Sequence, residues 1–353
     1  MKLSIISFTD QGRALSEKIE EMLREKQENR LYTKCRVCAE DAVSSSVEYV
    51  TAPLREWTEK QMQEKNALLF IGACGIAVRA IAPSITDKLQ DTPVLVMDEK
   101  GKYIIPILAG HMGGANELAE YFAKLTGAEP VITTATDLNE KFAVDLFAKR
   151  NHLAIRNKEG IVKVSSKALA GKEITISLES GHGNLAHMPE GVRLLPYPPT
   201  EPVDVLISSQ ETGFETAIFL KPKEYIIGMG CKKGKTVDEI NDFIEKKLQE
   251  LDILDTQIYA LASISQKCEE PGLIEWCRRK GVLFLTYTAA QLQQVKGEFQ
   301  KSAFVKGQVG VDNVCERAAL KACDLGGELI CRKSAENGMT IAVSKREWTV
   351  EFI

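Results

Sequence analysis

Apolar segments of strand length alternate with amphipathic segments of helix length along most of this chain, and this alternation is the strongest constraint on its fold. The run ALLFIGA at 67–73 is short, apolar and ends in glycine, which is typical of a buried parallel strand. The segment 114–126 places apolar residues on one helical face, and Gly127 follows it as a C-cap. Strands that alternate with helices predict an α/β layer with a largely parallel sheet.

The alternation stops near residue 151 and returns near residue 223. Between these points, short strand-like stretches are separated by Gly and Pro, with little helix signal. A length of 353 residues allows two or three domains. We therefore predict an α/β protein in three parts: an N-terminal α/β domain (1–150), a small β-rich middle module (151–222) and a C-terminal α/β domain (223–353).

Charge and apolar content exclude several classes of protein. The formal net charge of −4 lacks the global basic character of a nucleic-acid-binding protein. No stretch approaches the ~18 consecutive apolar residues of a membrane span, and the first residues lack the long apolar core of a signal peptide. We expect a cytoplasmic protein that binds neither nucleic acid nor membrane, and nine cysteines are compatible with a compartment that keeps thiols reduced.

The cysteines do not form a recognisable metal-binding pattern. Cys35 and Cys38 make a single CxxC motif, with no second pair and no nearby histidine. A structural zinc site needs four ligands at suitable spacing. We therefore predict no metal site.

The segment GMGCKKGKT at 228–236 has the end of a phosphate-binding loop but not its beginning. That motif needs a glycine where Met229 stands, and a dinucleotide-binding fingerprint needs its third glycine where Lys233 stands. What remains is a strand end, a glycine-rich turn and a helix start with three lysines, features that attract anions. Two interpretations stay open: a carboxylate-binding site and a solvated, charged turn.

The segment GACGIAVRAIAPSITDKLQD at 72–91 has the same layout of strand, glycines and helix start. Its Arg79 is a candidate partner for a carboxylate, and Asp87 is the acidic candidate. The alternative for each is an ordinary surface charge. His182 and the serines near it lie outside any strand-to-helix elbow, which argues against a serine-hydrolase triad, and we expect His152 and His187 to be solvated.

His111 stands between glycines in LAGHMGGANELA (108–119), where a strand passes into a helix. We place this turn at the carboxyl edge of the sheet, where open α/β sheets bind their ligands. An imidazole there can act as a general base near neutral pH. The alternative is a histidine that only makes a structural hydrogen bond in the turn.

Taken in order along the chain, five segments resemble the CbiG family of anaerobic cobalamin biosynthesis, the cobalt-precorrin-5A hydrolases. The segments are GACGIAVRAIAP, DTPVLVMDEKG, LAGHMGGANELA, PVITTATD and GMGCKKGKT. The resemblance runs from about residue 50 to the end of the sequence and is least specific in the middle module. The last domain is also similar to a small stand-alone protein of aerobic cobalamin synthesis.

The resemblance implies a reaction. Water opens a lactone on a cobalt-bound contracted macrocycle, a two-carbon unit leaves as acetaldehyde, and cobalt-precorrin-5B is formed. The substrate is a broad, flat macrocycle edged with carboxylates that carries its own cobalt, so no cofactor is expected. The expected partners are this cobalt-tetrapyrrole substrate and other enzymes of the cobalamin pathway; the oligomeric state stays open, with a homodimer as one candidate.

The resemblance also implies roles for residues. His111 is the general base or positions the attacking water, and the helix start beside it offers N–H donors to the developing oxyanion. Asn116 and Glu117 orient the ring or the water, or else only cap the helix and complement its dipole. Asp87 is the next candidate base. We assign substrate binding to a set of glycines, threonines and cations: Gly72, Gly75, Arg79, Gly110, Gly113, Gly114, Thr133, Thr134, Gly228, Gly230, Lys232, Lys233 and Lys235.

Two alternative functions stay open. The first is a non-catalytic carrier of corrinoid intermediates, which would use the same surfaces without a base. The second is a phosphate-loop enzyme, against which Met229 argues.

Overall fold

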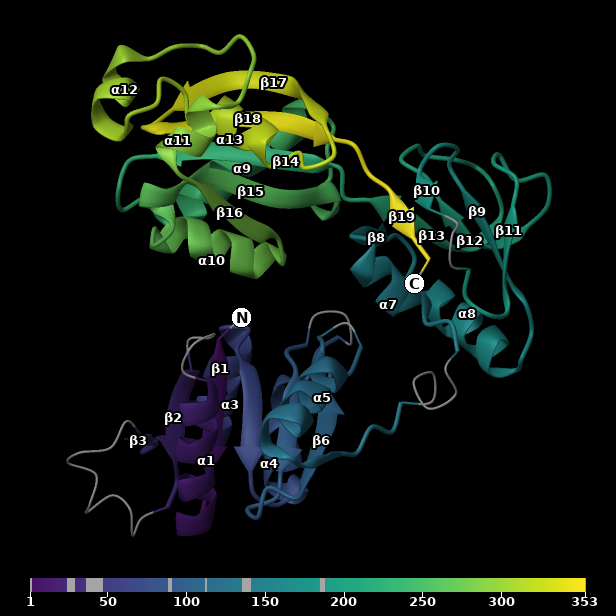
Figure 1. Ribbon diagram of the computed structural model, residues 1–353, viewed down its shortest axis with the longest axis vertical. Helices are drawn as coiled ribbons and strands as arrows, with labels where there is room; N and C mark the ends of the chain where they lie inside the picture. The colour runs from purple at the N-terminus through teal and green to yellow at the C-terminus, as the bar shows by residue number, and fades with distance from the viewer. Residues whose placement is uncertain are drawn as a thin grey trace. The chain divides into compact units, whose positions relative to one another are not determined.

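The computed structural model describes residues 2–23, 29–35, 47–87, 91–111, 113–134, 141–184 and 188–352, and only the backbone of residue 304. The chain separates into two compact units, Met1–Lys141 and Phe142–Ile353, whose elements are labelled in Figure 1. Helices pack on sheets of mostly parallel strands in both units, which confirms the predicted α/β class.

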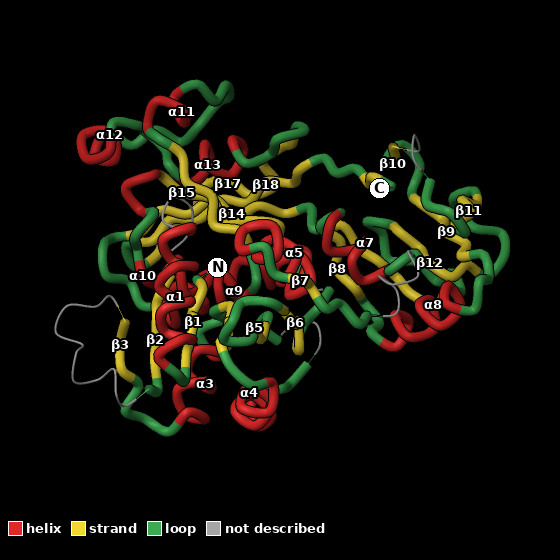
Figure 2. Tube along the Cα trace, turned by 60° about the horizontal axis from the view of Figure 1, so that its bottom comes forward, coloured by secondary structure: helices red, strands yellow, loops and turns green. Residues whose placement is uncertain are grey.

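A seven-stranded sheet forms the centre of the first unit, and Figure 2 shows β3, β2 and β1 followed by β5 and β6 across it. In spatial order its strands are β3 (Val47–Tyr49), β2 (Asn29–Thr33), β1 (Leu3–Ser7), β4 (Ala67–Ile71), β5 (Val94–Met97), β6 (Tyr103–Leu108) and β7 (Glu129–Pro130). The first five strands run parallel, whereas β6 is antiparallel to β5, and β7 runs in the direction of β6. The carboxyl end of β6 therefore lies at the edge where the parallel strands begin.

Helices cover both faces of this sheet. The helices on one face are α1 (Asp10–Leu23) and α5 (Ala115–Thr126), and those on the other are α3 (Leu54–Gln63) and α4 (Cys74–Ile81), which continues into the 3-10 helix η2 (Ala82–Ser84). Leu69 and Phe70 are neighbours in β4 and belong to different buried clusters. This follows from the period of two in a strand, because successive side chains point to opposite faces.

A five-stranded sheet forms the part of the second unit that we predicted as the middle module. In spatial order its strands are β11 (Val192–Leu195), β9 (Ile174–Leu178), β12 (Val203–Ile207), β13 (Thr216–Pro222) and β8 (Leu153–Ile155), with only β8 antiparallel to its neighbour. Its helices are α7 (Val144–Arg150), which we had assigned to the N-terminal domain, and α8 (Glu159–Leu169). The prediction of little helix in this segment missed α8, which packs closely on β13: a Cβ on Gly160 would lie 2.2 Å from the carbonyl oxygen of Ala217.

A second five-stranded sheet forms the C-terminal part of the same unit. In spatial order its strands are β16 (Leu283–Tyr287), β15 (Ile258–Ile264), β14 (Tyr225–Cys231), β18 (Met339–Arg346) and β17 (Gly327–Glu336), of which the first three run parallel and β18 and β17 are each antiparallel to the strand before. One face packs on α9 (Val237–Glu250) and α10 (Pro271–Lys280), and the other on α11 (Ala289–Gln293), α12 (Ala303–Val309) and α13 (Cys315–Lys321). Two 3-10 helices, η3 (Asp255–Gln257) and η4 (Ser265–Lys267), flank β15.

The end of the chain returns to the middle module. There β19 (Val350–Glu351) pairs with β10 (Gly183–Asn184), and the ring of His182 stacks on Trp348 with centroids 3.9 Å apart. His152 is exposed, as expected, and its ring meets that of Tyr259 edge to face with centroids 5.0 Å apart. Partial desolvation of the ring, Arg346 and Lys223 all lower the pKa of His152. His187 lies outside the described residues.

Gly228 explains how closely α13 approaches β14. A Cβ on Gly228 would lie 1.9 Å from the carbonyl oxygen of Cys315 and 2.8 Å from the Cβ of Ala319. Any larger residue would have to push α13 away from the sheet. This buried contact excludes Gly228 from the substrate-binding set, because the partner that approaches its backbone is a helix.

We predict that Gly228→Ala lowers the free energy of unfolding by about 1–3 kcal/mol, the usual cost of an added methyl group in a close-packed interior. Denaturant unfolding of the full chain measures it. Gly307→Ala in α12 is the matched control, because no atom lies within 4 Å of its Cβ position, and alanine there should be neutral or slightly stabilising. Equal stability of Gly228→Ala and the parent would contradict the direct helix–strand contact.

Candidate functional site

The His111 turn joins β6 to α5 at the edge of the first unit's sheet where the parallel strands begin. Leu108, the last residue of β6, pairs with Val94, the first residue of β5. A Cβ on Gly113 would lie 3.2 Å from the carbonyl oxygen of Asp91, just before β5. The predicted position at the carboxyl edge of the parallel strands was therefore wrong, because β6 reverses the direction of the chain.

The glycines around His111 each have a local structural cause. Gly114 is the N-cap of α5 and has a left-handed φ of +87°, which favours glycine. A Cβ on Gly113 would lie 2.4 Å from the Cβ of Ala109, and one on Gly110 would lie 2.8 Å from Oδ1 of Asn116. The tight turn thus requires glycines even without a ligand, and their contact with substrate stays a prediction.

Backbone hydrogen bonds close the same turn. The Gly114 N–H donates a hydrogen bond to the carbonyl oxygen of His111. The Ala115 N–H donates to the carbonyl oxygen of Ala109, and the Asn116 N–H to that of Gly110. All three N···O distances are 3.1 Å. These N–H groups are therefore used inside the turn. The predicted oxyanion donor at Gly114 is not a free donor in this conformation.

Asn116 ties the turn to a neighbouring segment. Its side chain is 8% exposed, and its Nδ2 donates to Oγ1 of Thr134 over 2.9 Å. It does not serve as the N-cap of α5, since Gly114 holds that position. Glu117 is exposed in the first turn of α5, and Thr133 is exposed beside Thr134.

Asp87 lies at the same edge, held by a neighbouring carboxylate. Oδ1 of the buried Asp91 accepts hydrogen bonds from the Thr86 N–H (3.0 Å), the Thr86 hydroxyl (3.0 Å) and the Asp87 N–H (3.3 Å). The Asp91 carbonyl oxygen also lies 3.2 Å from the Cβ position of Gly113. The structure thus brings His111, Asn116, Thr134 and Asp87 to one edge of the sheet.

Gly72, Gly75 and Arg79 lie toward the opposite edge. Gly72 follows β4 at its carboxyl end, and Gly75 lies in the first turn of α4. Nη1 of the exposed Arg79 comes within 3.4 Å of the Cβ position of Gly75. Here β1 and β4 lead to helices on opposite faces, the kind of switch point at which open α/β sheets bind ligands. The sheet of the first unit therefore has two edges at which the substrate could bind.

In the second unit, the turn after β14 is closed by the chain's own carboxylates. Thr236 and Glu239 form a capping box: the Thr236 hydroxyl accepts from the Glu239 N–H (3.2 Å), and the Glu239 carboxylate accepts from the Thr236 N–H (2.9 Å). Hydrogen bonds from Lys235 and Thr236 lower the pKa of Glu239 to about 2. The Gly234 N–H donates to Glu270 over 2.7 Å. The N–H groups and the lysine that we expected to bind a substrate anion therefore already bind the carboxylates of Glu270 and Glu239.

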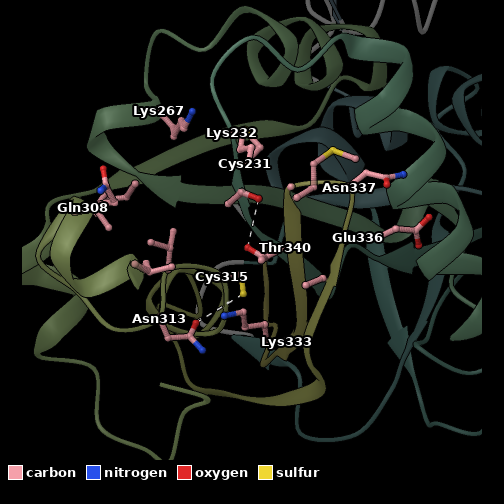
Figure 3. Close-up of a pocket in the computed structure, with 18 residues that line it drawn as sticks. Cys231, Lys232, Lys267, Gln308, Asn313, Cys315, Lys333, Glu336, Asn337 and Thr340 are labelled. Carbon is pink, nitrogen blue, oxygen red and sulfur yellow. Dashed lines mark hydrogen bonds between the residues drawn. The ribbon is translucent and has the colours of Figure 1, made fainter. Parts of the chain in front are cut away.

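The three predicted lysines of this turn therefore differ. Lys235 forms an ion pair with Glu239 at 2.6 Å, whereas Lys232 and Lys233 are exposed. Gly230 and Lys232 line a pocket of about 440 Å³ (Figure 3). Its other walls were missed from the sequence, because Asn313, Lys333 and Thr340 carry no motif. Lys333 and Thr340 come from the paired strands β17 and β18, whereas Asn313 lies just before α13.

Within the part of the chain that the structure describes, no three His, Cys, Asp or Glu side chains gather as ligands for a metal ion. Cys35 is buried with its Sγ 3.6 Å from Oδ1 of Asp10, and Cys38 lies outside the described residues. No helix among the described residues is long and apolar enough to cross a membrane.

Comparison with known proteins covers both units. The cobalamin synthesis G N-terminal family matches residues 56–137, and the cobalamin synthesis G C-terminus family matches residues 225–344. The first match contains the His111 turn and both edges of the first sheet, and the second contains the pocket lysines. A cobalamin biosynthesis protein G homologue of known structure from Sulfolobus solfataricus is 24% identical, covers 98% of this chain and 97% of its own, and has a TM-score of 0.39.

The similarity to two relatives of known name extends over most of the chain. The cobalt-precorrin-5A hydrolase of Priestia megaterium is 30% identical over 333 residues, which are 90% of this chain and 89% of the relative. The cobalt-precorrin-5A hydrolase of Salmonella typhimurium is 32% identical over 292 residues, 79% of this chain and 81% of the relative. These similarities, added to the two family matches, show that the chain belongs to the CbiG family of cobalamin synthesis.

Proposed function

We propose that this chain is a cobalt-precorrin-5A hydrolase of cobalamin biosynthesis. It opens the macrocycle lactone with water, releases acetaldehyde and gives cobalt-precorrin-5B. The observation that carries this conclusion is the similarity to two hydrolases of that name along most of the chain. The relatives' names support this function and not that of a non-catalytic corrinoid carrier.

We assign the chemistry to the His111 turn. The imidazole takes a proton from the water that attacks the lactone carbonyl, because its ordinary pKa lies near neutral pH. Since the Gly114 N–H is used inside the turn, the positive end of the α5 dipole acts on the developing negative charge. Asp87, at the same edge, is the next candidate base.

Asn116 acts as a positioning residue in this proposal. Its side chain is buried between the turn and Thr134, so it fixes the backbone that carries His111. Glu117 is exposed in the first turn of α5, where a carboxylate complements the helix dipole.

The exposed cations Arg79, Lys232 and Lys233 are proposed to meet substrate carboxylates, whereas Lys235 serves the α9 cap. The cobalt arrives within the substrate, so the proposal includes no resident cofactor. Partners besides the substrate stay predictions, namely other enzymes of the cobalamin pathway and a second copy of the chain. A cytoplasmic location stays a prediction as well.

Turnover with the purified chain tests the function. Incubation with cobalt-precorrin-5A should release one acetaldehyde per macrocycle, measured by a coupled alcohol dehydrogenase assay, while mass spectrometry follows the loss of the two-carbon unit. Heat-denatured protein is the control. Tight binding of the macrocycle without acetaldehyde release would contradict the hydrolase and favour the carrier.

We predict that His111→Ala keeps the fold and substrate binding but loses roughly 100-fold or more in kcat, the scale of one acid–base group. His152→Asn removes a histidine from the second unit and should keep the parental rate; its φ of +53° is one that asparagine tolerates. His111→Asn separates the two roles of the ring. A near-parental rate for His111→Asn would show that the histidine is structural and that the base must be sought at Asp87.

A further inference from the structure

The pocket in the C-terminal part of the second unit has a mostly apolar lining. It opens at the carboxyl end of β14 and the start of β18, and it is bordered by α12, the start of α13 and the β17–β18 turn (Figure 3). Its apolar side chains are Ile264, Val305, Val309, Val314, Ala335 and Met339. A volume of about 440 Å³ lies within the range of small-molecule sites.

Three lysines line this pocket, namely Lys232, Lys267 and Lys333. Lys267 pairs with the buried Glu270 at 2.7 Å. Among the described residues, no carboxylate forms an ion pair with Lys232 or Lys333, and Glu336 at the rim is paired with Lys246 at 2.6 Å. Lys232 and Lys333 therefore line a mostly apolar pocket without a counter-ion among the described side chains.

Lys333 is held in place by buried groups beneath it. Its backbone N–H donates to Oε1 of Glu316 over 2.8 Å, and Oε2 of the same fully buried carboxylate accepts from Nδ2 of Asn313 over 2.6 Å. Figure 3 shows the Lys333 ammonium beside the sulfur of Cys315. Burial raises the pKa of Cys315 to about 11, so a neutral thiol and not a thiolate stands next to the ammonium.

The apolar lining and the two lysines fit a ligand that has an apolar body and carboxylates at its edge. A half-buried ammonium loses hydration, and a ligand carboxylate would restore a charge-assisted hydrogen bond. A nucleotide phosphate would instead need free backbone N–H groups at the glycine-rich turn. Those of Gly234 and Thr236 donate to Glu270 and Glu239.

We propose that this pocket binds one carboxylate-bearing sector of the cobalt macrocycle, with Lys333 and Lys232 each paired to a side-chain carboxylate and the valines against the ring edge. The proposal rests on the proposed hydrolase function and adds a substrate-binding site in the second unit, apart from the His111 turn of the first. The family resemblance and the sequence motifs assign no role to Lys333.

Titration of the full chain with cobyrinic acid, a stable cobalt corrin with free carboxylic acids, tests this by visible absorbance. Lys333→Gln should raise Kd roughly 10-fold to 100-fold, as expected when a half-buried charged pair is lost. Lys232→Gln should raise Kd only about 2-fold to 5-fold, because Lys232 is exposed. Lys321→Gln is the control: it removes an exposed lysine at the far end of α13, outside the pocket, and should leave Kd unchanged.

The heptamethyl ester of the same corrin removes the carboxylates and completes a thermodynamic cycle. The parent should bind the ester more weakly than the acid, and Lys333→Gln should weaken ester binding no further. An equal loss for acid and ester, or an unchanged Kd for the acid, would overturn the pairing. If acetaldehyde release then persists, only the pocket assignment falls; if the parent releases none, the hydrolase function falls whatever the pocket binds.

Discussion

The antiparallel pairing of β6 with β5 determines where the proposed chemistry of the first unit can occur. This ladder runs from Val94–Leu108 to Met97–Ile104 and turns the chain around inside an otherwise parallel sheet. The His111 turn consequently lies beside Asp91, just before the start of β5, and not beside Gly72 at the end of β4. The catalytic assignment therefore rests on the local contacts of the turn, while the general preference of α/β sheets for ligands at their carboxyl edge points to the other side.

Internal carboxylates organise the second unit in a comparable way. Burial works to raise the pKa of Glu270, but hydrogen bonds from Lys267 and the Gly234 N–H outweigh it and lower the pKa overall. Lys267, paired with Glu270, and Lys235, paired with Glu239, therefore have structural roles. Lys232 and Lys333, which form no ion pair with a described carboxylate, line the pocket beside the paired Lys267. A lysine-rich turn thus contains both structural and ligand-facing charges, distinguished by their partners.

Much of the architecture was predictable from the sequence, because apolar periodicity reports which faces are buried. Strand direction was not, since an apolar run such as that of β6 has the same pattern whether it pairs parallel or antiparallel. The role of each glycine was ambiguous for a related reason. The missing side chain of Gly228 lets α13 approach, and that of Gly113 lets Ala109 approach. The sequence alone does not show whether a glycine makes room for a ligand or for another part of the protein. Lys333 was unpredictable because its environment is assembled by Glu316 and Asn313 from another element.

Hydrogen exchange of the His111→Ala variant, with and without cobalt-precorrin-5A, tests most directly whether substrate engages the His111 turn. The slow variant keeps the substrate intact during labelling. Our account predicts slower exchange in peptides that contain residue 111 and Asp87, at the edge where the parallel strands begin. Protection confined to Gly72–Arg79, with no change around residue 111, would contradict it and move the active site to the opposite edge of the sheet.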